Sequence, residues 1–272
     1  MNVAVYVGKS GAESDERLVR LVEELEQGGW KCCSVETGAA VPEGTDMVLS
    51  VGGDGTFLSV AKAVAGRNIL VAGVNMGRLG FLSENRPEEL ADALLAGEYT
   101  VENRTLLHAD VKTGHADIDE WPFALNEMSV RRSGAAMLGV EVTLDGVLLP
   151  IYWADGLVIS TSSGSTAYSL SVGGPIVLPE SRVLIISPIA PHNLNVRPLV
   201  VPDSSVVTLR MYSRDGKFEF SADNRTAEVT EETSVEIRMA QFSLKRVRLN
   251  RSNFINALTE KLYWGEDVRN IR

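Results

Sequence analysis

The spacing of apolar residues changes near Glu102, and this change limits the folds open to the chain. Before it, short apolar runs such as 3–7 and 69–74 alternate with segments that carry apolar residues at helical spacing. Strands that alternate with helices are typical of a parallel sheet with helices on both faces. After Glu102, apolar residues recur at every second position, which is the pattern of half-buried strands. The sequence therefore predicts an α/β domain over residues 1–102 and a β-rich domain over residues 103–251.

Residues that favour helix ends mark several boundaries in the first domain. Ser14 is expected to cap a helix that Gly28 and Gly29 stop. Pro87 suits the first turn of another helix, which Gly97 ends. These signals place helices between the predicted strands.

Asp-Gly pairs stand at 145–146 and 215–216, each between two runs of alternating residues. Asp-Gly is a preferred sequence for the two-residue turn of a β-hairpin, so we expect a hairpin at each pair. A last helical pattern runs over 254–262, with Ser252 as its expected cap, and predicts a final helix within 252–264. Its apolar face is expected to pack on the first domain, which this helix would complete.

The charge of the chain excludes two classes of partner. The formal net charge is −10, whereas proteins bind duplex DNA and anionic membranes through positively charged surfaces. The N-terminus has no basic run followed by an apolar stretch, and no run of about 18 apolar residues could span a bilayer. The sequence predicts a soluble, cytoplasmic protein, for which a small anionic substrate remains possible.

The cysteines and histidines indicate no metal site. Cys32 and Cys33 are adjacent and would point to opposite faces of an extended segment, so neither a disulfide nor a zinc site is expected. His108, His115 and His192 lack the spacing of metal ligands. We interpret the two cysteines as reduced thiols.

The stretch Gly52-Gly53-Asp54-Gly55-Thr56 is the most specific local feature. It lies between an apolar strand and a helical pattern over 57–65. Backbone N–H groups that converge without side chains can bind phosphate. The alternative is a tight turn with Asp54 as a solvated or capping residue. The phosphate site is favoured because ligands of open parallel sheets bind beyond the carboxyl ends of the strands.

Two common phosphate-binding motifs are excluded. Leu58 stands where the dinucleotide-binding fingerprint has its third glycine, and a carboxylate in the turn would repel a pyrophosphate. Gly8-Lys9-Ser10 is similar to the end of a Walker A motif, but Val3 replaces the earlier glycine. An incidental phosphate contact from Lys9 is the most that we expect there.

Asp54 has two chemical roles open to it. A carboxylate among phosphate-binding amides can accept a proton from an attacking hydroxyl during phosphoryl transfer. A lone aspartate can equally bind Mg²⁺ through water. The residues alone leave both roles open.

Two further segments indicate a ligand site. Asn126 and Glu127 interrupt an apolar segment, and such a pair at a strand end can bind the polar edges of a nucleotide; two solvent-facing side chains are the alternative. The stretch 153–171 is rich in small hydroxyl residues, which permit close backbone approach. A flexible linker is the alternative there, but the stretch also holds aromatic and aliphatic residues that linkers seldom carry, so we favour a binding loop.

In this order and separation, the Gly-Gly-Asp-Gly-Thr turn, the Asn126-Glu127 pair and the block 155–171 resemble the NAD kinase family, bacterial type. The stretches 73–81 and 191–198 are similar to the same family, so the resemblance covers nearly the whole chain. Gly-Gly-Asp-Gly alone also resembles the lipid kinases and, more loosely, the phosphofructokinases. The resemblance implies a phosphofructokinase- and diacylglycerol-kinase-like α/β domain, then an all-β sandwich-like domain, with the final helix returning to the first domain and the active site between the domains.

The resemblance also implies an activity. A family member would transfer the terminal phosphoryl group of ATP, with Mg²⁺, to the 2′-hydroxyl of the adenosine ribose of NAD, giving NADP. It would form a homodimer or homotetramer in which a neighbouring subunit completes the site. Asp54 would be the catalytic proton acceptor, with Gly55 beside it. The residues implied to contact NAD are Asp54, Gly55, Asn126, Glu127, Asp155, Ser163, Thr166, Ala167, Tyr168, Ser169, Leu170 and Ser171.

The sequence departs from the family pattern at Asp223-Asn224-Arg225, where many members carry Asp-Gly-Gln. An arginine there could bind a phosphate bidentately or lie on the surface. Two other functions compete with NAD kinase. A lipid kinase would need an apolar pocket and membrane attachment, against which the acidity and the lack of a basic amphipathic helix count. A non-catalytic nucleotide sensor would gain nothing from a carboxylate that faces phosphates.

Overall fold

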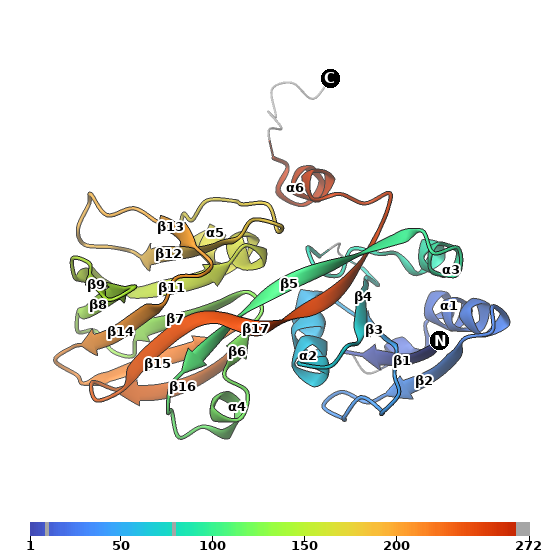
Figure 1. Ribbon diagram of the computed structural model, residues 1–272, viewed down its shortest axis with the longest axis horizontal. Helices are drawn as coiled ribbons and strands as arrows, with labels where there is room; N and C mark the ends of the chain where they lie inside the picture. The colour runs from blue at the N-terminus through green and yellow to red at the C-terminus, as the bar shows by residue number, and fades with distance from the viewer. Residues whose placement is uncertain (9–10, 78–79, 265–272) are drawn as a thin grey trace. The chain divides into compact units, whose positions relative to one another are not determined.

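The computed structural model describes residues 1–8, 11–77 and 80–264, and Figure 1 shows its secondary structure. The chain forms two compact units: unit 1 comprises residues 1–103 and the C-terminal segment from Leu244, and unit 2 comprises residues 104–243. Residues 244–251, which the alternation pattern grouped with the β-rich half, make their contacts in unit 1. Lys9, and Arg78 and Leu79 of the stretch 73–81, lie outside the described residues.

Unit 1 is built on a parallel sheet, as predicted. Its strands are β1 (Asn2–Val7), β2 (Lys31–Val35), β3 (Met47–Val51), β4 (Leu70–Val74) and the last part of β17 (Ser234–Leu249). They lie in the order β2-β1-β3-β4-β17, and every neighbouring pair is parallel. Each residue of β3 is buried, as expected for a central strand with both faces covered.

The helices of unit 1 are η1 (Ala12–Ser14), α1 (Glu16–Gln27), α2 (Asp54–Val64), α3 (Pro87–Leu95) and α6 (Phe254–Leu262). The main core lies between the sheet and helices α1 and α3, with Leu21, Leu25 and Leu90 among its fully buried side chains. Helix α6 also belongs to this unit, and its Phe254 ring lies 6.1 Å from that of Phe81. The predicted return of the final helix is confirmed.

Both predicted serine caps are wrong by one residue. The cap of α1 is Asp15, whose carboxylate accepts the N–H of Arg17 at 3.0 Å, while Ser14 ends a 3₁₀ turn. The cap of α6 is Asn253, which accepts the N–H of Asn256 at 2.8 Å. Asp and Asn are at least as good caps as Ser, and in each case the residue after the serine has the extended backbone that a cap requires.

Unit 2 consists of two antiparallel sheets. The six-stranded sheet runs β13 (Leu199–Pro202), β12 (Val183–Ile189), β11 (Gly156–Thr161), β7 (Glu127–Arg132), β15 (Lys217–Ala222), β16 (Arg225–Thr230). The other sheet contains β10 (Tyr152–Ala154), β8 (Leu138–Leu144), β14 (Val207–Tyr212) and the first part of β17, with β9 (Val147–Leu148) beside β8. Strand β5 (Tyr99–Asp110) pairs with β17 and with β6 (Phe123–Ala124), and the short helix α4 spans Ala116–Asp119.

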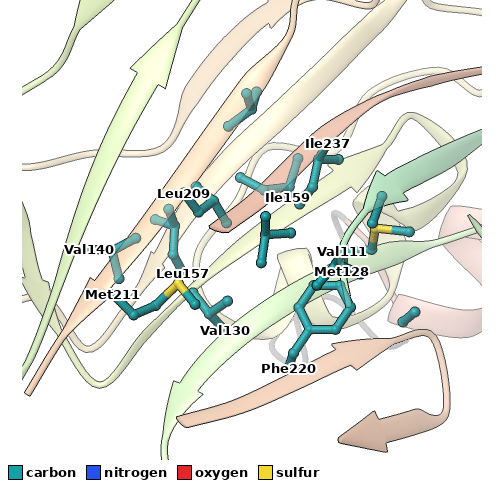
Figure 2. Close-up of a cluster of buried hydrophobic side chains, with 14 of the residues drawn as sticks. Val111, Met128, Val130, Val140, Leu157, Ile159, Leu209, Met211, Phe220 and Ile237 are labelled. Carbon is teal, nitrogen blue, oxygen red and sulfur yellow. The ribbon is translucent and has the colours of Figure 1, made fainter. Parts of the chain in front are cut away.

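The core of unit 2 lies between these two sheets. Figure 2 shows Val130, Leu157 and Phe220 of the six-stranded sheet in one cluster with Val140 and Leu209 of the other. All five side chains are fully buried. Because inward residues of both sheets share one core, unit 2 is a β-sandwich, which confirms the predicted second fold.

The two Asp-Gly pairs have different outcomes. At Asp145-Gly146 both φ angles are positive, 50° and 82°, and β8 pairs with β9 around the turn, so this hairpin is confirmed. The hairpin at 215–216 is wrong, because β14 pairs with β8 and β17 whereas β15 pairs with β7 and β16. The chain crosses there from one sheet to the other. The hairpin of this region is formed instead by β15 and β16, with its turn at Asp223 and Asn224.

Within the described part of the chain, every helix is too short or too polar to cross a membrane.

Candidate active site

Asp54 lies at the carboxyl end of β3, as the first residue of α2. The glycine-rich turn itself forms the start of this helix, which therefore begins three residues before the predicted pattern at 57–65. In the strand order β2-β1-β3-β4, the connections from β1 and β3 lead away in opposite directions. The carboxyl ends of β1 and β3 therefore flank the crevice in which open α/β sheets bind ligands.

Three backbone N–H groups hold the Asp54 carboxylate. Phe81 donates to Oδ2 at 2.8 Å, and Leu82 and Ser83 donate to Oδ1 at 2.9 and 3.0 Å. Two carboxylate oxygens offer about four acceptor positions, so the described residues leave roughly one position on Oδ2 open. The segment 80–83 therefore fixes the direction of the carboxylate without saturating it.

The fit around Asp54 requires a glycine at position 80. A Cβ added to Gly80 would lie 2.0 Å from Oδ1 of Asp54, far inside van der Waals contact. This close approach lets the 80–83 backbone wrap around the carboxylate. Neither the turn residues nor the strand pattern indicated that 80–83 would be its partner.

In unit 2, the end of β11 contacts the start of β7, where Asn126 precedes the strand and Glu127 is its first residue. The Thr161 N–H donates to the Asn126 carbonyl at 2.9 Å, and Thr161 Oγ1 donates to the Leu125 carbonyl at 2.7 Å. Gly164 packs so tightly that an added Cβ would lie 2.1 Å from the Asn126 carbonyl oxygen. These contacts bring the Asn126-Glu127 pair and the block after β11 together.

Asp223 organises the same segment from the β15–β16 turn. Its carboxylate accepts the N–H groups of Leu125 at 2.8 Å, Asn126 at 2.9 Å and Glu127 at 3.3 Å. Burial raises the pKa of Asp223. Burial and then the charge of Asp223 raise the pKa of Glu127 to about 8, so that Glu127 is largely a neutral carboxylic acid at neutral pH.

Arg225 takes neither of the two roles left open for it. Its guanidinium donates to the carbonyl of Asp117 at 3.0 Å, to that of Trp121 at 2.5 Å, and to that of Phe123. The side chain is therefore engaged with the backbone that leads into Asn126. It acts as a structural clamp of this segment.

The residues after β11 form η2 (Ser163–Thr166) and the short helix α5 (Tyr168–Ser171), not an extended loop. The Tyr168 N–H bonds the Glu127 carboxyl, and the Arg131 guanidinium lies over the Tyr168 ring at 6.0 Å. Ser163 Oγ lies 3.4 Å from Arg104 Nη1. Ser163 and Tyr168 thus share one site with Asn126 and Glu127.

The other implied contacts of this block differ in accessibility. Ser169 is fully buried and its Oγ lies 3.3 Å from Ser187 Oγ, so its side chain faces the core. Ser171 is exposed, while Thr166, Ala167 and Leu170 are half-buried. Ser169 therefore offers no accessible surface to a ligand in this chain.

Within one chain, Asp155 lies away from the site formed by Asn126, Glu127 and Tyr168. It pairs with Arg132, with Oδ1 2.8 Å from Nε, at the start of β11, whereas Glu127 faces Ser160 near its end. Five residue steps along a strand separate the two, which is roughly 17 Å. A cavity of about 650 Å³ opens beside Asp155, lined in part by His115, Arg131 and Arg132.

The comparisons with known proteins address the fold and its class. Residues 2–99 match the family model of the ATP-NAD kinase N-terminal domain, and residues 125–249 match that of the ATP-NAD kinase C-terminal domain. Among solved structures, an NAD kinase from Archaeoglobus fulgidus in complex with ATP superposes with a TM-score of 0.78 at 26% identity, over 96% of this chain and 98% of that one. The family matches and the shared fold define this chain as an enzyme of the kinase class.

The curated relatives are more similar in sequence. The NAD kinase of Flavobacterium psychrophilum is 43% identical over 229 residues, covering 83% of this chain and 78% of the relative. That of Bacteroides fragilis is 42% identical over 228 residues, covering 82% and 78%. The chain belongs to the NAD kinase family. Yeast NADH kinase complexed with NADH shares the fold, with a TM-score of 0.84 at 22% identity over 100% of this chain and 90% of that one.

Proposed function

We propose that this chain transfers the terminal phosphoryl group of ATP to the 2′-hydroxyl of the adenosine ribose of NAD, with Asp54 as the proton acceptor. The observation that carries the proposal is the carboxylate of Asp54 itself, held by three N–H groups beside the ligand crevice of the parallel sheet. Family membership supports the reaction and its two substrates.

The reaction forms a bond between the ribose 2′-oxygen and the γ-phosphorus and breaks the bond between that phosphorus and the β–γ bridging oxygen. ADP leaves, and the hydroxyl proton passes to Asp54. The open acceptor position on Oδ2 suits this proton, because the three N–H groups prevent the carboxylate from turning away. Phosphoryl transfer otherwise depends on positioning and on neutralising the phosphate charge.

Unit 2 supplies the proposed NAD-binding residues other than Asp54 and Gly55, which belong to unit 1. Asn126 and a largely neutral Glu127 present an amide and a carboxylic acid, which can both donate and accept hydrogen bonds with a nucleotide. Ser163 and Tyr168 lie at the same site, and the backbone of 166–171 adds donors and acceptors. Together they would hold NAD by polar contacts along one surface.

Mg²⁺ would accompany the triphosphate, and its charge would neutralise the phosphate oxygens. In the described ranges, no group of three or more His, Cys, Asp and Glu residues is placed to hold a metal ion. The donor set that is present, one Asp54 carboxylate with most of its acceptor positions used, fits a metal carried chiefly by the phosphates.

A second copy of the chain is part of the proposal. Asp155 lies roughly 17 Å from Glu127 along β11, so a single chain does not gather all the NAD-contacting residues of the family. In a homodimer or homotetramer, Asp155 of one copy would complete the site of another. The proposed location is the cytoplasm, where NAD and ATP are both available.

The test is the product formed from NAD, ATP and Mg²⁺, measured as NADP. Asp54→Asn should lower turnover by about 100-fold or more while NAD still binds, because only the proton acceptor is lost. Asp92→Asn, an exposed aspartate of α3, is the matched control and should keep the rate. NAD binding without turnover in the parent protein would indicate a sensor, and phosphorylation of diacylglycerol vesicles instead of NAD would indicate a lipid kinase.

A further inference from the structure

Three consecutive peptide groups of unit 1 lie between the Asp54 carboxylate and two cations. On the N–H side, the peptides that join residues 80–81, 81–82 and 82–83 all donate to Asp54, at 2.8 to 3.0 Å. A peptide group is a dipole, with its positive end at N–H and its negative end at C=O. The same three peptides therefore turn their carbonyl oxygens away from Asp54.

Those three carbonyl oxygens accept hydrogen bonds from cationic side chains of the C-terminal segment. Lys261 Nζ of α6 donates to Gly80 O. Arg246 of β17 lies with Nη2 3.3 Å from Phe81 O and with Nε 3.4 Å from Leu82 O. Each peptide is thus polarised by a cation on one side and by the Asp54 anion on the other, an arrangement in which hydrogen bonds strengthen one another.

The arginines of β17 are paired with glutamates of the same unit. Arg246 pairs with Glu84 at 2.7 Å and with Glu102 at 2.9 Å, and Arg248 also pairs with Glu102 at 2.9 Å. Lys261 adds a further cation on the carbonyl side of the segment that holds Asp54.

Lys261 is held firmly in this position. Its ammonium group lies 4.0 Å from the centroid of the Phe81 ring, in addition to its bond with Gly80 O. The charged groups around it are Asp54 of α2, Glu84 after β4, Arg246 of β17 and Glu260 of α6. Burial lowers the pKa of Lys261 to about 8, although Asp54 and Glu84 favour the charged form.

We infer that Lys261 is a positioning residue for the catalytic carboxylate: through the Gly80 carbonyl it holds and polarises the peptide that directs Asp54 toward the substrate hydroxyl. The inference rests on the proposed role of Asp54. It assigns the last helix a part in catalysis that is separate from its packing. The competing explanation is that Lys261 only anchors α6 to unit 1, in which case its charge would matter for stability and not for turnover.

Steady-state kinetics of the full-length enzyme separate these two roles. Lys261→Met keeps most of the aliphatic stem but removes the charge, and it should lower kcat by about 10- to 100-fold, as the loss of a partner that holds a functional group usually does. The KM for NAD and its Kd from calorimetry should change by less than about threefold, because unit 2 carries most of the proposed NAD contacts. Lys261→Arg, which keeps the charge, should recover most of kcat.

Lys217→Met is the matched control. Lys217 is an exposed lysine of β15 in a surface ion pair with Glu228 at 2.8 Å, far in sequence from the segment that holds Asp54. It should keep the kcat of the parent enzyme. Wild-type kcat in Lys261→Met would overturn the inference, and so would an equal loss of kcat in Lys261→Met and Lys261→Arg. If Lys261→Met does not fold, Lys261→Arg alone decides through its pH profile.

The pH profile supplies a readout that a purely structural role would not move. The charge of Lys261 is lost as pH rises through about 8, so kcat of the parent enzyme should fall on the alkaline side. In Lys261→Arg the cation persists, and the alkaline limb of the kcat profile should move upward by one pH unit or more. An unchanged alkaline limb in Lys261→Arg would contradict the inference.

Failure of this inference is distinguishable from failure of the proposed function. If Asp54→Asn is inactive and Lys261→Met keeps its kcat, only the role of Lys261 is wrong. If Asp54→Asn keeps its kcat, Asp54 is not the proton acceptor and both proposals fall.

Discussion

Asp223 and Arg225, two residues apart on the β15–β16 hairpin, hold the same segment by opposite kinds of backbone group. The Asp223 carboxylate accepts N–H groups of residues 125–127, and the Arg225 guanidinium donates to carbonyls of residues 117, 121 and 123. An anion and a cation at one turn thus fix the backbone that presents Asn126 and Glu127. The segment has little regular structure of its own, with β6 only two residues long, so its shape depends on this pair.

Arg225→Met should loosen that segment and weaken NAD binding. The substitution leaves three carbonyl oxygens without their charged donor, and each hydrogen bond to a charged group contributes about 1.5–3 kcal/mol. We expect the KM for NAD to rise about tenfold or more, with a smaller change in kcat, because Asp54 lies in the other unit. A lysine can satisfy fewer of the carbonyls than an arginine. The KM for NAD of Arg225→Lys should therefore lie between those of the parent enzyme and Arg225→Met.

Kinetics with NAD as the varied substrate measure this effect. Arg182→Met is the matched control, since Arg182 is an exposed arginine whose guanidinium pairs with Asp203 at 3.1 Å. A parental KM in Arg225→Met would show that the 117–127 segment keeps its shape without the clamp.

The pKa of Glu127 makes the stability of unit 2 depend on pH. It is raised from its ordinary value of 4.5 to about 8, so between these values the folded state keeps a proton that the unfolded state releases. The free energy of unfolding should therefore fall as pH rises, by up to about 1.4 kcal/mol per pH unit. This contribution is complete below pH 4.5 and is lost as pH passes through about 8.

Thermal unfolding between pH 5 and 8 tests this dependence. Glu127→Gln mimics the neutral acid and should make the Tm less dependent on pH than in the parent protein. Glu228→Gln, an exposed glutamate of β16, should keep the parental slope. Equal slopes in the parent protein and Glu127→Gln would mean that Glu127 is charged in the folded state.

Local signals were sufficient for much of the fold. The parallel α/β unit follows from the spacing of apolar residues, the hairpin at Asp145-Gly146 from turn chemistry, and the return of the final helix from its apolar face. The same Asp-Gly dipeptide failed at 215–216, because a turn sequence specifies the bend but not the partners of the flanking strands. Partner choice depends on which inward faces fill the common core, and this is set by residues far away in the sequence.

The candidate site was predictable to a similar extent. Asp54 could be predicted because three glycines surround it within five residues, between an apolar strand and a helical pattern. Lys261 and Arg246 were missed because they reach the Asp54 segment across more than 160 residues of sequence. Asp223 did leave a signal: an Asp-Asn pair directly after an alternating run is a turn sequence, and Asp223 has the positive φ of 53° that such a turn uses.

Gly80→Ala tests how closely the direction of the Asp54 carboxylate limits turnover. The new Cβ would lie 2.0 Å from Oδ1 and 2.8 Å from Cγ of Asp54, so the carboxylate must move away from the N–H groups that hold it. A displacement of about 1 Å at a reacting group can cost on the order of 100-fold in rate, and we expect kcat to fall by about that factor while the KM for NAD stays close to the parental value. Gly77→Ala is the matched control, because an added Cβ there meets no atom of the described residues within 4 Å. If both variants keep the parental kcat, Gly80→Ala displaces the Asp54 carboxylate without slowing turnover. The direction of that carboxylate then does not limit phosphoryl transfer.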